Sequence, residues 1–240
     1  MKGIVLAGGT GSRLMPLTQV TNKHLLPIGR FPMIFYPIAK LKEAGVFDIL
    51  IVTGTEHMGA IVTLLGSGKN YGVKFTYKVQ DEAGGIAQAL GLAETFVGTD
   101  KMVVILGDNI FEGSLKNQVV QFEKQLEGAR LLIKKVLDPC RYGVPTLKGD
   151  QIVKITEKPA RPASSYAVTG VYMYPSNVFQ VIQTLNPSKR GELEITDVNN
   201  HYVRQKQMTY DTLHGWWTDA GTHDSLEHAS RLAKGYNLKF

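Results

Sequence analysis

The stretch GIVLAGGTGSRLMPLT, residues 3–18, runs from an apolar, β-branched segment into a cluster of glycines, an arginine and a proline. A glycine loop directly after a strand commonly binds phosphate, because backbone N–H groups can approach an anion closely where no side chain intervenes. The loop lacks the Gly-Lys-Ser/Thr ending of a Walker loop, and Leu14 stands where a dinucleotide fingerprint needs its third glycine. From Gly8 to Pro27 the sequence therefore predicts a long phosphate-binding loop of another kind. A glycine turn followed by solvated basic residues is the structural alternative.

The first half of the chain alternates strand and helix patterns. This alternation predicts an α/β fold with a mostly parallel, doubly wound, Rossmann-like sheet, whose ligands bind at the carboxyl ends of the strands. Predicted strands lie at 3–7, 48–54, 73–79 and 102–107, and predicted helices lie at 31–45, where Pro37 should introduce a bend, at 59–66 and at 84–97.

The second half favours strands joined by short polar turns, followed by helices. We expect these elements to extend the sheet and to close over its ligand edge. The sequence contains neither a Ser/Gly linker nor an internal repeat, which predicts one domain over residues 1–240. Predicted strands lie at 129–136, 142–147, 151–159, 166–174 and 207–213, and predicted helices near 175–185, 194–206 and 223–235.

The charge balance favours anionic partners. The net charge is +6, but the basic residues are dispersed, without zinc-finger spacing or the aromatic pattern of an RNA-binding sheet. Phosphorylated metabolites are therefore expected rather than nucleic acid, and no apolar run is long enough to predict a membrane partner.

Cys140 is the single cysteine and cannot form an internal disulfide, which favours a cytoplasmic location. No residue near Cys140 in the sequence could serve as its base, so a catalytic thiol is disfavoured.

Several segments, taken in order, resemble the sugar-nucleotidyltransferase family over nearly the whole chain. Two departures accompany this resemblance. His24 stands where the family usually has glutamine, and the chain stops at Phe240 where many members carry a further helical extension. Regulation and assembly that depend on this extension are therefore left open. The segments are LAGGTGSRLMPLT, NKHLLP, LGDNIF, RYGV, TEKP, YAVTGVYMY, RGELEITDVN and DAGTHDSL.

The resemblance implies that the phosphate of glucose 1-phosphate attacks the α-phosphorus of dTTP, giving dTDP-glucose and pyrophosphate. Such a transfer needs no protein nucleophile, but it needs two polyanions aligned and positive charge where negative charge develops. By resemblance, Arg13 covers the nucleotide phosphates, Lys23 pairs with the triphosphate, and Lys158 holds the sugar phosphate. Residues 1–110 form the nucleotide-binding half and residues 111–240 the sugar-phosphate-binding half.

The resemblance also implies Mg²⁺ as cofactor, held by Asp108 and Asp219. Two separated aspartates suit Mg²⁺, which binds one or two carboxylates together with phosphate oxygens and water. Without a metal, Asp108 could cap a turn and Asp219 could serve a helix start. His24 is expected to be structural rather than a base. The implied nucleotide-binding residues are Leu6, Gly8, Gly9, Thr10, Gly11, Gln80 and Gly85, and the implied sugar-binding residues are Asn109, Gly143, Glu157, Val168, Tyr172 and Glu192.

Two other functions remain open on the sequence. The same chemistry could use UTP or another hexose 1-phosphate, since a single methyl contact discriminates only modestly. The chain could also be a non-catalytic nucleotide-sugar-binding regulatory module, which would normally have lost catalytic positions, whereas Arg13, Lys23, Asp108, Lys158 and Asp219 are all present. A symmetric homo-oligomer is the default expectation for an enzyme of this kind.

Overall fold

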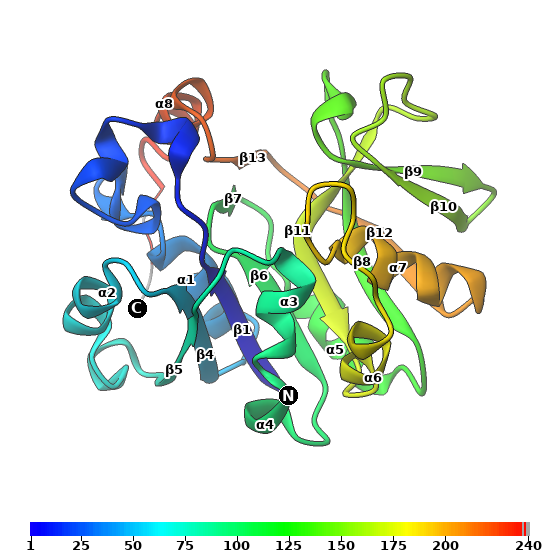
Figure 1. Ribbon diagram of the computed structural model, residues 1–240, viewed down its shortest axis with the longest axis horizontal. Helices are drawn as coiled ribbons and strands as arrows, with labels where there is room; N and C mark the ends of the chain where they lie inside the picture. Colours follow the sequence, from blue (N-terminus) through cyan, green and yellow to red (C-terminus); the bar gives the residue numbers. More distant parts are fainter. Residues whose placement is uncertain (237, 239–240) are drawn as a thin grey trace.

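A seven-stranded sheet organises the computed structural model, which describes residues 1–236 and 238 (Figure 1). β1 pairs in parallel with β4 and β6, β4 with β5, and β8 with β12, whereas β11 is antiparallel to both β6 and β8. The predicted mostly parallel α/β sheet is confirmed. In spatial order the strands are β12 (Met208–Thr212), β8 (Ala129–Lys135), β11 (Tyr166–Tyr174), β6 (Met102–Leu106), β1 (Lys2–Ala7), β4 (Asp48–Gly54) and β5 (Lys74–Gln80).

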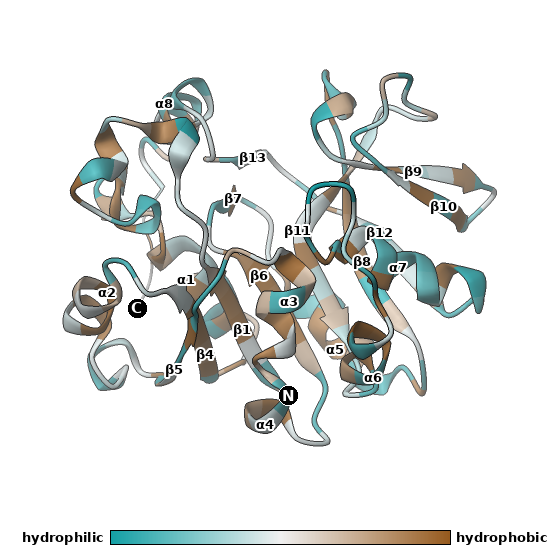
Figure 2. Ribbon diagram, in the orientation of Figure 1, coloured by the Kyte–Doolittle hydropathy of each residue, from teal (hydrophilic) through white to brown (hydrophobic). Residues whose placement is uncertain are grey.

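Helices cover both faces of the sheet, which explains why the central strands are continuously apolar (Figure 2). Ile4 and Leu6 of β1 face one core together with α3, α4, α6 and α7. Val5 and Ala7 face the other core with α1, α2 and α5. The helices are α1 (Phe35–Glu43), α2 (Met58–Leu65), α3 (Ile86–Gly91), α4 (Glu94–Val97), α5 (Lys116–Lys124), α6 (Val178–Gln183) and α7 (Ile195–Arg204).

Four short strands were not predicted, namely β2 (Pro27–Ile28), β3 (Phe31–Pro32), β7 (Asn109–Phe111) and β13 (Trp217–Asp219). Three further differences from the sequence-based expectation concern the helices. α1 begins at Phe35, so Pro37 lies in the first turn, where a missing N–H interrupts no helical hydrogen bond, and not in the middle of a longer, bent helix. The helix predicted over 84–97 is two short helices, α3 and α4. α5 was not predicted.

The second half of the chain completes the sheet and adds two small ladders beside it (Figure 1). Since β8, β11 and β12 belong to the same sheet as β1, residues of both halves contribute to the core on each face of the sheet. The division into functional halves stays a prediction. The added elements are the β9 (Gly143–Lys148) and β10 (Gln151–Glu157) hairpin, the ladder of β7 (Asn109–Phe111) with β13 (Trp217–Asp219), and α8 (His223–Leu232).

The segment between β1 and α1 contains only short helical turns and the two-residue strands β2 (Pro27–Ile28) and β3 (Phe31–Pro32). Gly9 and Gly11 have φ angles of 90° and 64°, which favour glycine, and the Thr18 hydroxyl donates to the Gly11 carbonyl at 2.9 Å. No helix of the described chain is long and apolar enough to cross a bilayer. The helical turns between β1 and α1 are the 3-10 turns η1 (Ser12–Leu14), η2 (Leu17–Gln19) and η3 (Lys23–Leu25). Two further 3-10 turns lie elsewhere in the chain, η4 (Lys69–Tyr71) after α2 and η5 (Pro139–Arg141) after β8.

Candidate active site

A cavity of about 390 Å³ lies at the carboxyl edge of the sheet, against the ends of β1, β5 and β6 and facing β11 and the β9–β10 hairpin. Except for Thr10 and Gly11, every sequence-predicted site residue lines this cavity. Thr10 lines a neighbouring cavity of about 190 Å³, and Gly11 begins the η1 turn. The predicted residues that line the larger cavity are Leu6, Gly8, Gly9, Arg13, Lys23, Gln80, Gly85, Asp108, Asn109, Gly143, Glu157, Lys158, Val168, Tyr172, Glu192 and Asp219.

Lys23 and Asp108 form an ion pair on the floor of the cavity. The Lys23 Nζ lies 2.7 Å from Asp108 Oδ2, and the two side chains are only 14% and 15% exposed. Burial alone would raise the pKa of the Asp108 carboxyl, but the Lys23 ammonium opposes this and holds that pKa well below its usual range. Asp108 therefore carries its negative charge at neutral pH, directly beside a cation.

Asn109 is fixed by three neighbours. Its Oδ1 accepts hydrogen bonds from the Trp217 indole and from the Gly170 N–H, both at 2.8 Å, and its Nδ2 donates to Asp108 Oδ1 at 3.1 Å. A Cβ at Gly170 would lie 2.5 Å from Asn109 Nδ2, so this close approach requires glycine. Asn109 is thus rigidly placed at the cavity wall.

Asp219 lies at the end of β13, opposite Asn109 in the antiparallel ladder with β7. The Tyr142 hydroxyl donates to Asp219 Oδ1 at 2.7 Å, and Arg141 Nη2 lies 3.2 Å from Oδ2. Burial and the negative charge of Asp108 raise the pKa of the Asp219 carboxyl, while the Tyr142 hydrogen bond and Arg141 work against this. The negative charge of Asp108 therefore disfavours the ionised form of Asp219.

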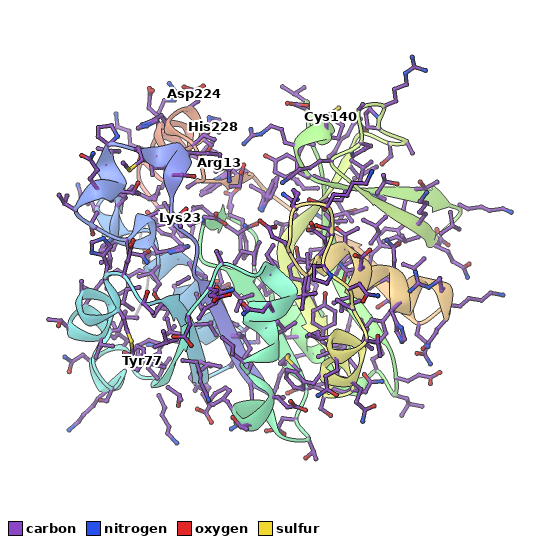
Figure 3. The ribbon with its side chains drawn as sticks, in the orientation of Figure 1. Arg13, Lys23, Tyr77, Cys140, Asp224 and His228 are labelled. Atoms are coloured by element: carbon purple, nitrogen blue, oxygen red, sulfur yellow. The ribbon has the colours of Figure 1, made fainter. Side chains whose placement is uncertain are left out.

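Arg13 extends from the glycine loop toward the same acid. A Cβ on Gly221 would lie 3.1 Å from Arg13 Nη2 and 3.6 Å from Asp219 Oδ2, so the missing side chain leaves room for the guanidinium. Figure 3 shows Arg13 and Lys23 in one part of the molecule and Cys140 across from them. Arg13 and Arg141 both line the cavity, and both approach Asp219.

Several of the residues predicted to bind the sugar phosphate come from paired backbone segments. Gly143 and Glu157 are partners in the β9–β10 hairpin, and the Thr196 hydroxyl donates to Glu157 Oε2 at 2.6 Å. Lys158 follows directly, with its side chain 50% exposed and its Nζ 3.8 Å from Glu157 Oε1. Lys158 is therefore free to turn toward an anion in the cavity.

Two further cations of the cavity, Arg141 and Arg190, were not singled out from the sequence. Arg190 Nη2 lies 2.8 Å from Glu194 Oε2 and 3.4 Å from Glu192 Oε2. Both arginines belong to the segments RYGV and RGELEITDVN, so the signal that could have identified them was their place inside these motifs.

His24 is buried and is not among the residues that line the cavity. It is 1% exposed, its Nδ1 lies 2.8 Å from Asn22 Oδ1, and a Cβ on Gly107 would lie 2.5 Å from its ring. Burial, followed by the positive charge of Lys23, lowers the pKa of His24 to about 3. The imidazole is thus neutral and packed behind the Lys23–Asp108 pair.

The two aspartates fit a divalent cation. They repel each other, both carry oxygen atoms at the cavity wall, and a cation between them would remove the repulsion. Among the described residues no group of three acidic, histidine or cysteine side chains is arranged to hold a metal. A bound ion would therefore take its other ligands from phosphate oxygens and water.

Sequence and structure comparisons assign the class of this site. The chain matches the nucleotidyl transferase family over residues 2–234 and belongs to that family. It is 42% identical to the glucose-1-phosphate thymidylyltransferase of Neisseria meningitidis, a match that covers 98% of this chain and 83% of the relative. A crystal structure from Bacillus anthracis, of a protein that carries the provisional name glucose-1-phosphate thymidylyltransferase and is in complex with a sucrose, is 59% identical, with a TM-score of 0.97 over 100% of this chain and 98% of that one. A UDP-glucose pyrophosphorylase complexed with UDP-glucose is 25% identical, with a TM-score of 0.86 over 98% and 99% of the two chains.

Proposed function

We propose that this chain is an enzyme that condenses dTTP with glucose 1-phosphate to dTDP-glucose and pyrophosphate. The observation that carries the proposal is that Lys23, Lys158, Asp108 and Asp219, from four separate segments, line one cavity in a chain 42% identical to a named glucose-1-phosphate thymidylyltransferase. The cavity combines cations for phosphates with carboxylates for a metal.

The reaction needs no nucleophile from the protein. An oxygen of the sugar phosphate forms a bond to the α-phosphorus of dTTP, the bond from that phosphorus to the bridging oxygen breaks, and its electron pair leaves with pyrophosphate. No proton has to be removed from the attacking group. The protein must instead hold two polyanions in line and neutralise their repulsion.

The cations of the cavity divide this task. Arg13 and the N–H groups of the glycine loop bind the nucleotide phosphates, and Lys23 binds the triphosphate, including the pyrophosphate that leaves. Lys158, half exposed on the opposite hairpin, binds the sugar phosphate. Each such preorganised charge stabilises the transition state by on the order of 3 kcal/mol.

Asp108 and Asp219 hold the divalent cation, for which Mg²⁺ is the proposed ion. When bound, it supplies positive charge to the phosphates as negative charge develops. Lys23 is the partner of Asp108 in this structure at 2.7 Å. We infer that Lys23 leaves Asp108 to pair with phosphate when the triphosphate binds, which would free the Asp108 carboxylate to hold the metal.

The two ends of the cavity recognise the two substrates. Gln80 and Gly85 face the pyrimidine ring, near Leu6 and Gly8. The carboxamide oxygen of Gln80 can accept a hydrogen bond from a ring N–H of the pyrimidine. The opposite end holds the glucose hydroxyls through the sugar-binding residues, namely Asn109, Gly143, Glu157, Val168, Tyr172 and Glu192.

The test is pyrophosphate release by the purified chain with dTTP, glucose 1-phosphate and Mg²⁺. We expect release that depends on all three components and that falls at least about a hundredfold in Asp108→Asn. Asp150→Asn, which changes an exposed acid in the turn between β9 and β10, is the matched control and should retain full activity. Folded wild-type protein that releases no pyrophosphate would favour the non-catalytic binding module instead.

A second candidate keeps the chemistry and uses UTP. The observation that favours it is the 0.86 TM-score with the UDP-glucose pyrophosphorylase. The ratio of kcat/KM for dTTP and UTP decides between the two, and we expect dTTP to be preferred.

Two wider expectations belong to the same proposal. We propose a symmetric homo-oligomer, tested by light scattering, and an enzyme that acts in the cytoplasm on small phosphorylated metabolites. Binding to generic DNA that falls steeply with added salt would contradict the choice of small phosphates over nucleic acid.

A further inference from the structure

We propose that Gln88 is a positioning residue that fixes the orientation of the Gln80 carboxamide, so that the site selects bases carrying a ring N–H, thymine and uracil, over cytosine. The inference rests on the proposed function, because it requires a pyrimidine nucleotide beside Gln80. It assigns a specificity role to a residue that does not need to touch the base.

Gln80 ends β5 with only 7% of its surface exposed and lines both cavities. Its Nε2 donates to Gln88 Oε1 at 2.5 Å and to the Gly85 carbonyl at 3.4 Å. A backbone carbonyl can only accept, so the atom that faces Gly85 must be the amide nitrogen. The orientation of the Gln80 amide therefore follows from a backbone contact as well as from Gln88.

These two contacts engage both hydrogens of the Gln80 amide. The remaining polar atom, Oε1, lies beside Gly8, since a Cβ on Gly8 would lie 2.5 Å from it. Gly8 lines the cavity, so Gln80 presents an acceptor on this side. A ring N–H matches this acceptor, and the unprotonated ring nitrogen of cytosine, which is itself an acceptor, does not.

Gln88 is held in place by its own packing. It lies in the first turn of α3, and a Cβ on Gly84 would lie 2.9 Å from its Cδ and 3.2 Å from its Nε2. The Leu193 N–H donates to the Gly84 carbonyl at 2.8 Å, which fixes the loop that supports Gln88. The side chain is therefore confined between this loop and Gln80.

The test compares kcat/KM for dTTP and dCTP, with glucose 1-phosphate as the second substrate. Gln88→Met keeps the length and helix preference of the side chain but removes the acceptor, so that only the longer contact with the Gly85 carbonyl, at 3.4 Å, opposes a flip of the Gln80 amide. We expect the dTTP-to-dCTP ratio to fall at least about tenfold, by loss with dTTP and gain with dCTP. Gln88→Glu keeps an acceptor oxygen in the same place and is the matched control, with a ratio within about threefold of wild type.

Two further measurements keep the inference testable if Gln88→Met does not fold. Gly84→Ala displaces the Gln88 side chain and should lower the ratio in the same direction. The wild-type ratio is itself decisive, because turnover of dCTP as efficient as that of dTTP would contradict the inference without any variant. A purely structural Gln88 would lower kcat/KM for both nucleotides equally, and an unchanged ratio in Gln88→Met would overturn the proposal.

Failure of this inference is distinguishable from failure of the proposed function. Wild-type protein that releases pyrophosphate from neither nucleotide would contradict the proposed function. Wild-type protein active with dTTP, together with an unchanged ratio in both Gln88→Met and Gly84→Ala, would contradict the role of Gln88 alone.

Discussion

Asp219 and Asn109 are direct partners in the antiparallel ladder of β13 and β7, and the Ala220 N–H donates to the Asp108 carbonyl at 2.8 Å. Two acids from opposite halves of the chain are thus brought together by backbone pairing rather than by side-chain contacts. The arrangement holds the proposed metal ligands at a fixed separation before any ion binds. Such preorganisation reduces the cost of assembling charge at the moment of reaction.

Lys23→Met should lower kcat/KM with dTTP by at least about a hundredfold, because it removes a preorganised cation from the triphosphate site. The substitution also leaves Asp108 buried without its cation, so the pKa of that carboxyl should rise from its depressed value. Steady-state kinetics and thermal unfolding measure both effects. Lys154→Met, at an exposed position of β10, is the control, and equal activity of the two variants would contradict the role of Lys23.

Tyr142→Phe should raise the Mg²⁺ concentration needed for half-maximal activity severalfold. The Tyr142 hydroxyl donates to Asp219 Oδ1 at 2.7 Å and favours the charged carboxylate, a type of hydrogen bond worth about 1.5–3 kcal/mol. Activity at saturating Mg²⁺ should recover most of the wild-type rate. The measurement is a Mg²⁺ titration of initial rates with Tyr210→Phe, a half-buried tyrosine of β12, as control. An identical Mg²⁺ dependence in Tyr142→Phe and wild type would refute this assignment.

His24→Gln should make the protein less sensitive to acid. The folded-state pKa of His24 is lowered to about 3 from 6.5, so its stabilising contribution is fully present above pH 6.5 and is lost as the pH falls toward 3. At about pH 4.5 the loss for wild type amounts to about 2–3 kcal/mol in the free energy of unfolding.

Urea unfolding at about pH 7 and pH 4.5 measures this difference in wild type, in His24→Gln and in His201→Gln. His201 lies on α7, in a different part of the fold from the Lys23–Asp108 pair, and serves as control. We expect the acid-induced loss to shrink only in His24→Gln. The same loss in all three proteins would show that other groups cause it.

Gly85→Ala should destabilise the fold and reduce activity more than Gly149→Ala does. Both glycines have positive φ, 98° and 57°, so both substitutions strain the backbone, and Gly85, with ψ of 173°, lies in a region essentially restricted to glycine, where strain amounts to about 1–3 kcal/mol. A Cβ on Gly85 would in addition lie 2.6 Å from the Leu193 carbonyl oxygen, whereas no atom lies within 4 Å of one on Gly149. Thermal unfolding and kcat/KM of the two variants test this prediction. Equal effects would contradict it and would mean that the backbone at Leu193 can move to make room for the added Cβ.

Much of the fold could be predicted from local patterns. Runs such as residues 3–7 and 102–107 are apolar on both faces, because helices cover both sides of the sheet. Each of these strands can therefore be predicted to be buried from its own residues alone. The glycine loop, Asp108 after β6 and Asp219 before α8 could likewise be predicted. A phosphate can approach the backbone closely only where side chains are absent, and a divalent cation needs carboxylate oxygens as ligands. The division into two functional halves and the roles of the site residues remain predictions.

Contacts between distant segments were decided only by the tertiary structure. The way in which distant segments meet in space decides the antiparallel direction of β11, the pairing of Asp219 with Asn109, and the 3.2 Å contact of Arg141 with Asp219. The orientation of the Gln80 amide likewise depends on Gln88 and Gly85. Local sequence encodes burial and periodicity, but strand order, register and side-chain partners arise from packing between segments, which no single stretch of residues specifies.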